Sequence, residues 1–527
     1  MSKIKEESIK QATFIMMATI LLSRLLGFVR EMLIASIFGR TYITDAFFAA
    51  FSIPDLMFYL LVGGALNSGF MPVFNSQKAK GDEKGAWNAA STFLTVSVIF
   101  ILAFNILGII FAPYLMPLVA NGITKSPDTF ALAVKLTRIM FSAVSFTVMA
   151  GLLGGILNSY KIFSIPSMGP VLYNVGIIIG AALLSKFFGV YGLAFGVILG
   201  ALANFGVMVP SFAKVGKSFR FKLDLKDPLY KKMLLLMGPA MIGLSFSQVN
   251  LIVNQNIASM LDEGVITALR YANRIILLPL GIFASSVAIA IFPTLNSLIG
   301  RNEMDQYKRT LYLGLQSILF ITIPSAIGMI ALNAPIVRLL FRSGKFTEAD
   351  VAVTAYALAF YSIGVIGQSA VQVVTRAYYS LQDTITPVKV GGAMVAANLV
   401  LNLLFLKVSS LAIGGIALSY SITSILNVVI LYRILVKKLN GLNTSSIITC
   451  VVKSSAASLL MGVAAYFTTH ALEGMLGIAS KMSQLIEVGA GVAVGALIFF
   501  LVAYLLKMEE LAYFLNMALR KFKKSAV

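Results

Sequence analysis

Long apolar runs alternate with short polar connectors along nearly the whole chain. An α-helix needs roughly 20 apolar residues to cross the hydrocarbon core of a bilayer. The pattern predicts an all-α integral membrane protein with about fourteen transmembrane helices, because the alternating strands of a barrel do not produce such long runs. The runs lie near 11–38, 44–75, 90–120, 129–155, 163–185, 190–212, 232–260, 265–299, 310–340, 349–376, 386–406, 411–436, 446–469 and 481–506.

Composition supports a membrane protein and excludes most enzyme classes. Hydrophobic residues make up 58% of the chain and charged residues 12%, about half the charged share of a soluble domain. The single Cys450 and the single His470 leave no Cys/His metal cluster, and no P-loop is present. The opening apolar run is too long and too charged for a cleavable signal peptide. We therefore expect neither a catalytic site nor a metal.

The formal net charge of +21 comes from basic residues in the connectors, mostly those after even-numbered runs. The connector with Lys214, Lys217 and Arg220 is the clearest case. The positive-inside rule then places both termini in the cytoplasm, which also requires an even number of helices. Because topology explains the charge, no nucleic-acid partner is expected.

The chain also repeats itself at a nearly constant offset. Ile34-Ala35-Ser36 recurs as Ile257-Ala258-Ser259, and Pro72 recurs as Pro293. Duplication predicts two pseudo-symmetric six-helix lobes plus two extra C-terminal helices, with the substrate between the lobes and transport by alternating access. The predicted parts are an N-lobe at 1–213, a basic cytoplasmic linker at 214–231, a C-lobe at 232–438, extra helices at 446–507 and a basic cytoplasmic tail at 508–527.

Ionised residues inside the apolar runs mark the candidate site. The first run contains Arg24, Arg30 and Glu31, and a later run contains Arg270 and Arg274. A charge deep in a bilayer is costly, so it normally faces a polar cavity on a transport path. Arginine binds phosphate oxygens with its planar fork, which makes a diphosphate the natural ligand. A structural lock between helices is the alternative for Arg24 and Glu31, and an interfacial position is the alternative for Arg270.

Other polar residues are more ambiguous. Asp45 opens the second run, where a helix cap, a partner for an arginine and an outer gate all fit. Arg338 and Arg342 lie near a helix end, which is typical of side chains that snorkel to the interface. Four buried amides form a candidate site for a small cation, although interhelical hydrogen bonds explain them equally well: Asn250, Asn254, Asn398 and Asn402. The glycine run Gly192, Gly196 and Gly200 predicts close helix packing.

Several motifs resemble the MurJ/MviN lipid II flippases, a family of the multidrug/oligosaccharidyl-lipid/polysaccharide (MOP) exporter superfamily. The similarity extends over essentially the whole chain. The motifs are Ser23-Arg24-Leu25-Leu26-Gly27-Phe28-Val29-Arg30-Glu31, Thr44-Asp45-Ala46-Phe47-Phe48, Gly69-Phe70-Met71-Pro72-Val73-Phe74, Tyr271-Ala272-Asn273-Arg274, Gly344-Lys345-Phe346-Thr347 and the segment from Tyr379 to Pro387.

The resemblance implies a substrate site in which Arg24, Arg30 and Arg274, with Ser23, bind a diphosphate and its sugar–peptide headgroup. It implies that Asp45 is needed for transport, and Glu31 is grouped with it as a gating residue. The implied activity moves undecaprenyl-diphosphate-linked peptidoglycan precursor to the outer leaflet of the bacterial cytoplasmic membrane. No cofactor is implied; the driving force is the membrane potential or a monovalent ion. Membrane lipids and the cell-wall synthesis machinery are the expected partners.

The chain departs from the family pattern at several positions. Many relatives carry a basic pair where this chain has Phe58 and Tyr59, an acid at Gly63 and an acid at Asn273. Three other functions stay open: a flippase for another polyprenyl-diphosphate oligosaccharide, a multidrug exporter, and a membrane glycan polymerase. The two extra helices favour lipid II over the first, and the basic cavity disfavours the second. The polymerase would need an outward-facing carboxylate, for which Asp45 is the candidate.

Overall fold

The computed structural model of the protein describes residues 9–216, 218–408 and 411–511, and this part of the chain is helical without strands. The all-α membrane fold is therefore confirmed. Among the described residues, twelve helices are long and apolar enough to cross a membrane, and they match the predicted runs two to six and eight to fourteen. The helices α1 and α9, 30 and 31 residues long, fall outside this set, so the count of fourteen stays a prediction.

The helices form two compact units, and each is described by itself. Unit 1 comprises residues 1–267 and 343–346, and unit 2 comprises residues 268–342 and 347–527. The predicted lobe boundaries stay a prediction, because they describe duplication rather than packing. Most of the predicted tail 508–527 lies outside the described residues.

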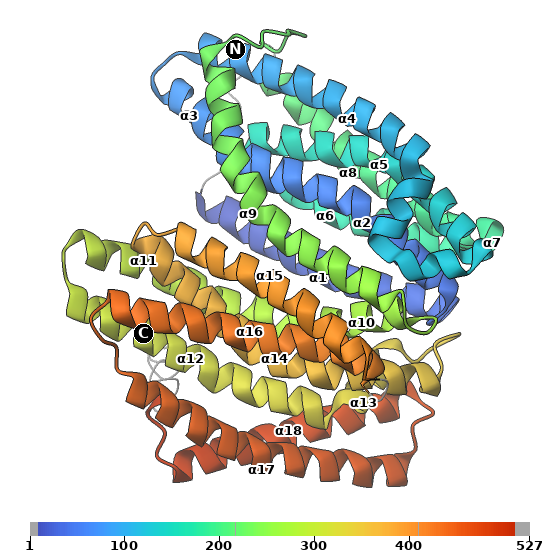
Figure 1. Cartoon of the computed structure of the whole chain (residues 1–527), viewed down its shortest axis with the longest axis vertical. Coiled ribbons are helices and arrows are strands. Elements are labelled where there is room, and N and C mark those ends of the chain that lie inside the picture. The colour runs from blue at the N-terminus through green and yellow to red at the C-terminus, as the bar shows by residue number, and fades with distance from the viewer. Residues whose placement is uncertain (1–8, 217, 409–410, 512–527) are drawn as a thin grey trace. The chain divides into compact units, whose positions relative to one another are not determined.

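Unit 1 contains the first nine α-helices and three irregular helical segments (Figure 1). Its helix α9, which the repeat assigns to the C-lobe, packs on α4 and η1. The elements are α1 (Ile9–Phe38), α2 (Tyr42–Phe58), η1 (Tyr59–Phe70), α3 (Met71–Ala79), α4 (Glu83–Ala120), η2 (Asn121–Lys125), α5 (Pro127–Ser159), α6 (Ser164–Ile179), η3 (Gly180–Leu184), α7 (Ser185–Phe188), α8 (Tyr191–Val215) and α9 (Pro228–Ala258).

Close packing in unit 1 follows the glycines and the aromatic side chains. A Cβ on Gly176 of α6 would overlap the backbone of Gly200 on α8, which confirms the close approach predicted from the glycine run. Around α3 and α4, Phe70 stacks on Phe74 with ring centroids 5.3 Å apart, and Trp87 packs edge-on against Phe74. This buried cluster fixes the α2–α5 scaffold on which the candidate site is built.

Unit 2 contains the remaining helices. The hairpin of α17 and α18 lies beside α12 in Figure 1, in agreement with the contacts between these helices. The elements are α10 (Val265–Pro279, with its first three residues in unit 1), η4 (Leu280–Ala284), α11 (Ser285–Gly300), α12 (Met304–Ala331), α13 (Asn333–Phe341), α14 (Glu348–Ser380), α15 (Ile385–Leu406), α16 (Ala412–Lys438), α17 (Thr444–Leu476) and α18 (Lys481–Leu505).

One predicted helix is interrupted. The apolar run 310–340 was expected to form a single helix, but α12 ends at Ala331 and α13 begins at Asn333. Pro335 explains the break, because proline lacks the N–H that a continuous helix would need and its ring would clash with the carbonyl of residue 331. The side chain of Asn333 accepts a hydrogen bond from the backbone N–H of Ala334 and so satisfies a donor at the new helix start.

Candidate functional site

Arg24 lines an open pocket in unit 1. The pocket has a volume of about 360 Å³ and is formed by α1, the end of α5 and the start of α6. Ser23, Asn158 and Ser167 supply polar groups, and the rest of the lining is apolar. Arg24 is exposed, and within the described part of the chain it makes no hydrogen bond or ion pair. Its five donors are therefore available to an anion.

Arg30 is held in a polar network six residues, or nearly two helical turns, further along α1. Its Nη2 lies 2.6 Å from Glu31 Oε1, and its Nη1 donates to Asn174 Oδ1 at 3.1 Å. The side chain of Arg30 is 13% exposed and that of Glu31 is 1% exposed. Because both charges are largely buried, pairing offsets much of their desolvation cost. This ion pair lies within α1, and the contact to Asn174 is the one that links Arg30 to α6, so a lock between helices by Glu31 stays a prediction.

Asn174 of α6 connects the Arg24 pocket to the polar network of Arg30. Its Nδ2 donates to the Ser23 carbonyl at 3.2 Å and to Ser23 Oγ at 3.3 Å, while its Oδ1 accepts from Arg30. Sequence reasoning missed Asn174, although an isolated amide in the apolar run 163–185 is a signal that could have identified it. Asp55 was missed as well; with Asn204 it lines a second pocket of about 170 Å³ in unit 1.

Asp45 is buried and binds the connector before α10. Its Oδ2 accepts from the backbone N–H of Gly264 at 2.7 Å, and its Oδ1 accepts from the N–H and hydroxyl of Thr267 at 2.9 and 2.6 Å. Thr41, not Asp45, occupies the N-cap of α2. The carboxylate thus accepts hydrogen bonds from backbone N–H groups at the start of α10, where a negative charge is favourable. Its predicted role in transport is untested by this geometry.

Arg270 and Arg274 lie on α10 in unit 2, and both are half-buried. Tyr271, between them, stacks on Phe341 of α13 with ring centroids 4.6 Å apart and an interplanar angle of 15°. This stacking fixes the rotation of α10 and hence the face on which the two arginines lie. The candidate site is therefore described in two parts, with Arg24 and Arg30 in unit 1 and Arg274 in unit 2.

The four amides proposed for a cation are divided between the units. Asn250 and Asn254 lie on α9 in unit 1, and Asn398 and Asn402 lie fully buried on α15 in unit 2. Asn402 Nδ2 donates to Asn398 Oδ1 at 3.1 Å, so the second pair is joined by a hydrogen bond. The cation site stays a prediction. Over the described residues, no cluster of His, Cys, Asp and Glu has the makings of a metal site.

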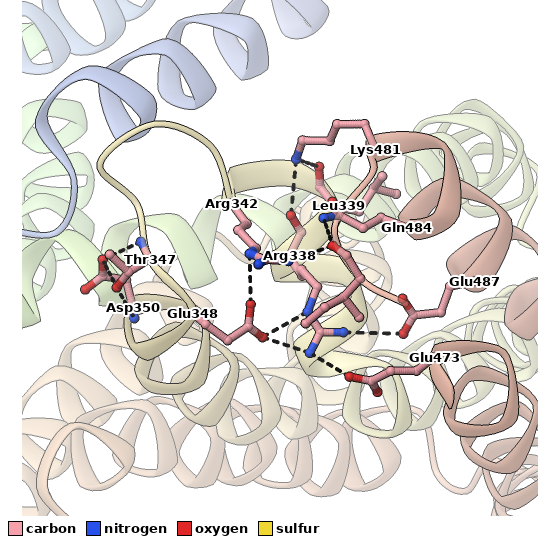
Figure 2. Close-up of polar contacts among 11 residues, drawn as sticks. Arg338, Leu339, Arg342, Thr347, Glu348, Asp350, Glu473, Lys481, Gln484 and Glu487 are labelled. Carbon is pink, nitrogen blue, oxygen red and sulfur yellow. Dashed lines mark hydrogen bonds and ion pairs between the residues drawn. The ribbon is translucent and has the colours of Figure 1, made fainter. Parts of the chain in front are cut away.

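Arg338 differs from the expectation that it snorkels. Figure 2 shows its guanidinium surrounded by three carboxylates, from Glu348, Glu473 and Glu487, at 2.8, 3.3 and 3.5 Å. The side chain is 8% exposed. The expectation was wrong because snorkelling assumes that water is the partner of a charge near a helix end, whereas here acids from other helices replace water. Arg342 is more exposed and contacts Glu348 at 3.1 Å.

The motif between Tyr379 and Pro387 forms the turn between α14 and α15. The Asp383 carboxylate accepts from the N–H of Thr386 at 3.0 Å and from Lys438 Nζ at 2.8 Å. Partial burial acts to raise the pKa of Asp383, but the hydrogen bonds from Lys438 and Thr386 outweigh it and lower the pKa to about 2. This motif residue is therefore structural: it holds the turn to the end of α16.

A bundle of membrane-spanning helices with an accessible arginine in a polar pocket defines a multi-pass membrane transporter. The family model for the lipid II flippase MurJ matches residues 34–486. The chain belongs to the lipid II flippase MurJ family, and it is a transporter rather than an enzyme.

Similar proteins cover nearly the whole chain. A probable lipid II flippase MurJ from Buchnera aphidicola subsp. Acyrthosiphon pisum is 32% identical over 94% of this chain and 96% of its own length. The lipid II flippase MurJ from Burkholderia cenocepacia is 33% identical over 78% of this chain and 81% of its own length.

Solved structures agree with this assignment. A lipid II flippase MurJ in an inward closed conformation matches with a TM-score of 0.78 at 27% identity, over 93% of this chain and 98% of that chain. A multidrug resistance MATE family transporter of the MOP superfamily matches with a TM-score of 0.67 at 14% identity, over 81% of this chain and 98% of that chain. The second likeness concerns the fold alone.

Proposed function

We propose that this chain moves a polyprenyl-diphosphate-linked peptidoglycan precursor, lipid II, from the inner to the outer leaflet by alternating access. The diphosphate and headgroup are held by Arg24, Arg30 and Arg274, with Ser23 beside them. The bacterial cytoplasmic membrane is the proposed location, with both termini in the cytoplasm. Family membership supports the substrate, and the one-sided basic connectors support the orientation.

The exposure of Arg24 in its pocket is the observation that carries the proposal. A cation in the apolar part of a membrane protein is costly, and this one has no partner within the described residues. A bound diphosphate would supply the missing charge and accept two parallel N–H···O bonds from the fork. The neutral groups of Ser23, Asn158 and Ser167 suit the sugar and peptide parts of a headgroup, which are rich in hydroxyls and amides.

Arg30 has a different part in the proposal. Because Glu31 and Asn174 already occupy two of its terminal nitrogens, it reaches a substrate only if those contacts rearrange. Release of Asn174 when Arg30 binds substrate phosphate would couple binding to movement of α1 against α6. Glu31, which pairs with Arg30 within α1, would act in gating by competing with the phosphate for this arginine. Asp45 acts at the α2–α10 contact in the same scheme, where its three hydrogen bonds fasten the start of α10.

The energy source is proposed to be the membrane potential or a monovalent ion, and cell-wall synthesis enzymes are the proposed partners. The nearest rival is a flippase for another polyprenyl-diphosphate oligosaccharide. Both substrates contain the diphosphate, so Arg24 could bind either one. The complementation test must therefore compare strains that need different headgroups transported, as well as arginine variants.

The test is complementation of bacterial cells depleted of their own lipid II flippase. Parent, Arg24→Ala, Arg24→Lys and Arg274→Ala are compared at matched membrane abundance. Arg433→Ala, which removes an exposed arginine near the end of α16, is the matched control. We expect the parent and the control to restore growth and both alanine variants to fail. Arg24→Lys should restore growth partly, because a point charge cannot form the bidentate pair.

Two outcomes contradict the proposal. Growth restored by Arg24→Ala and Arg274→Ala would assign the arginines to structure. Failure of an abundant parent to restore growth, together with rescue of a strain that lacks an oligosaccharide flippase, would establish the rival substrate.

A further inference from the structure

The charged cluster around Arg338 lies far along the chain from the arginines of the proposed substrate site. We propose that Arg338 is a positioning residue that clamps the α17–α18 hairpin onto α13 and α14, and that transport requires this clamp. The second half of this statement rests on the proposed function, whereas the first half concerns the fold and is tested separately.

The clamp joins three elements through one side chain. Arg338 Nε and Nη2 bind Glu348 of α14 at 2.9 and 2.8 Å. Nη2 also lies 3.3 Å from Glu473 of α17, and Nη1 lies 3.5 Å from Glu487 of α18 (Figure 2). A guanidinium presents five donors in a fixed plane, so it can serve three carboxylates at once. An ammonium group has no comparable fork.

The burial of Glu487 makes its pairing with Arg338 necessary. Glu487 is 2% exposed, and its Oε2 has no hydrogen-bond partner within the described part of the structure. A buried carboxylate is tolerated when an opposite charge accompanies it. Arg338 is the cation that meets Glu487, at 8% exposure. The first turns of α18 can therefore stay docked with Glu487 ionised only while Arg338 occupies its place.

Backbone contacts reinforce the same end of the hairpin. Lys481 Nζ donates to the carbonyl of Leu339 at 2.8 Å, and Arg342 Nη1 donates to the carbonyl of Ile478 at 2.6 Å. Gln484 Nε2 donates to the Ile478 carbonyl as well, at 2.8 Å. The Lys481 charge lies at the C-terminal end of α13, where a cation is favourable. The turn 477–480 is thus tied to α13 from both sides (Figure 2).

The other end of the hairpin is held differently. There α17 and α18 pack on α12 mainly through apolar side chains, with Phe320 and Phe499 ring centroids 5.2 Å apart. One neutral hydrogen bond, from Gln316 Nε2 of α12 to the Ser446 carbonyl of α17 at 3.3 Å, accompanies this packing. Apolar packing within a bilayer gains little from the hydrophobic effect and does not specify one register. Directional, charge-assisted hydrogen bonds do specify a register. The clamp therefore fixes where the hairpin sits along α12 and α13.

The remaining charges near the clamp are accounted for. His470 Nδ1 lies 3.9 Å from Glu473 and is largely exposed. Asp350 is engaged in the capping box of α14 with Thr347. The clamp therefore consists of five ionised groups with Lys481 at its edge: Arg338, Arg342, Glu348, Glu473 and Glu487.

Hydrogen–deuterium exchange of residues 477–490 in the full-length protein tests the clamp directly. We expect Arg338→Gln to accelerate exchange in this segment by about tenfold or more, since it removes charge-assisted hydrogen bonds. Arg338→Lys should give a smaller acceleration. Lys453→Gln, which removes the bond from Lys453 Nζ to the Leu506 carbonyl at the other end of the hairpin, is the matched control and should leave residues 477–490 unchanged.

A second-site variant separates two effects of losing Arg338. One is the loss of its hydrogen bonds, and the other is the cost of leaving the Glu487 carboxylate buried without an opposite charge. Adding Glu487→Gln to Arg338→Gln removes the stranded carboxylate but does not restore the hydrogen bonds of the guanidinium, so exchange should slow only in part and stay above the parental rate. Where Arg338→Gln does not accumulate, Glu473→Gln serves instead, because Glu473 is more exposed than Glu487 and its loss should loosen the turn while Glu487 keeps its contact with Arg338.

Transport is then measured by complementation at matched abundance. A loosened hairpin together with lost growth in Arg338→Gln, both persisting in the Arg338→Gln/Glu487→Gln double variant, supports the proposal. Full recovery of exchange and growth in the double variant overturns it, because the hairpin would then dock and function without Arg338. Unchanged exchange in Arg338→Gln or in Glu473→Gln overturns the clamp, and loosened exchange with full growth overturns its role in transport. Failure of the parent to restore growth would count against the proposed function alone, because the exchange experiment does not depend on it.

Discussion

Arg24 and Arg338 are both arginines in apolar parts of the sequence, yet their surroundings are opposite. Arg24 is exposed in a pocket of about 360 Å³ and has no partner among the described residues. Arg338 is buried and meets three carboxylates. A guanidinium whose donors are already used cannot bind a ligand without first losing a partner, whereas one with open donors can. The difference makes Arg24 the candidate for ligand binding and gives Arg338 a structural position.

Arg30 lies between these extremes. Glu31 and Asn174 use two of its terminal nitrogens, but the network is smaller than that of Arg338 and adjoins the Ser23 side of the Arg24 pocket. The three arginines therefore differ in how many of their donors are used by partners in the protein. Arg24 uses none among the described residues, Arg30 uses some, and Arg338 contacts three carboxylates. Substitutions of these arginines should lower stability most at Arg338 and least at Arg24, whereas the direct loss of substrate binding should be largest at Arg24.

The largest difference in stability is expected between Arg338→Leu and Arg24→Leu. Loss of Arg338 leaves Glu487 buried without an opposite charge, which typically costs about 3–5 kcal/mol. Arg24→Leu removes no internal contact among the described residues and should change the free energy of unfolding by less than about 0.5 kcal/mol. Thermal unfolding of the two purified variants in one detergent measures the contrast. Equal destabilisation would remove the distinction between the two arginines.

Asp45 sharpens the comparison, because its charge is satisfied by backbone and hydroxyl donors rather than by an arginine. Asp45→Ala leaves the N–H groups of Gly264 and Thr267 without their acceptor, at about 1–3 kcal/mol for each stranded buried donor. Asp45→Asn keeps one acceptor oxygen and should lose about half as much. The same unfolding assay measures both. If Asp45→Ala and Asp45→Asn unfold alike, the hydrogen bonds to α10 are not what Asp45 contributes.

The helical membrane fold was predictable because apolar runs of membrane-spanning length leave few alternatives. The close approach of α6 and α8 was predictable for a similar reason, since Gly192, Gly196 and Gly200 lack the side chains that would separate the backbones. Family motifs assign Arg24 to the site, and Arg24 lines a pocket in the structure; its role in substrate binding stays a prediction.

The partners of the charges were not predictable in the same way. Arg338, Glu473 and Glu487 are distant in sequence, and each alone resembles a charge at the end of a helix. Their convergence depends on the helix break at Pro335 and on how the α17–α18 hairpin docks, and neither leaves a local periodic signal. Asn174 was overlooked because a lone amide does not indicate which neighbour it will bind. Which side chains pair across helices depends on how the helices pack, and the local sequence does not encode this.

Asn174→Ala tests whether Arg30 is exchangeable. The variant removes the acceptor of Arg30 Nη1 and the donor to Ser23, so we expect a loss of about 1–2 kcal/mol in stability. Transport should fall more than stability predicts, because Arg30 loses the contact that orients it. Complementation at matched abundance measures the loss of transport. Asn105→Ala, which removes another buried side-chain hydrogen bond between helices, is the control. A parallel loss in both variants would make Asn174 a packing residue only.

The smallest effect is expected at Asp383, where the ion pair with Lys438 is partly exposed, in contrast to the buried clamp. The pKa of Asp383 is about 2 in the folded protein, below its ordinary value of 3.8, so the folded state binds fewer protons than the unfolded state between these values. Its contribution is therefore complete above about pH 5 and disappears as the pH falls from about 4 to 2. Because Lys438 is 41% exposed, the contribution should be below about 1 kcal/mol.

Unfolding of the parent and of Asp383→Asn is compared across this range, so that the titration of other carboxylates cancels in the difference. A constant difference above pH 5 that shrinks toward pH 2 is the expected result. A difference that persists at pH 2 would mean that Asp383 stabilises the turn through its shape and neutral hydrogen bonds. In that case the ion pair with Lys438 would contribute nothing measurable, and the contrast with the buried Arg338 clamp would become sharper.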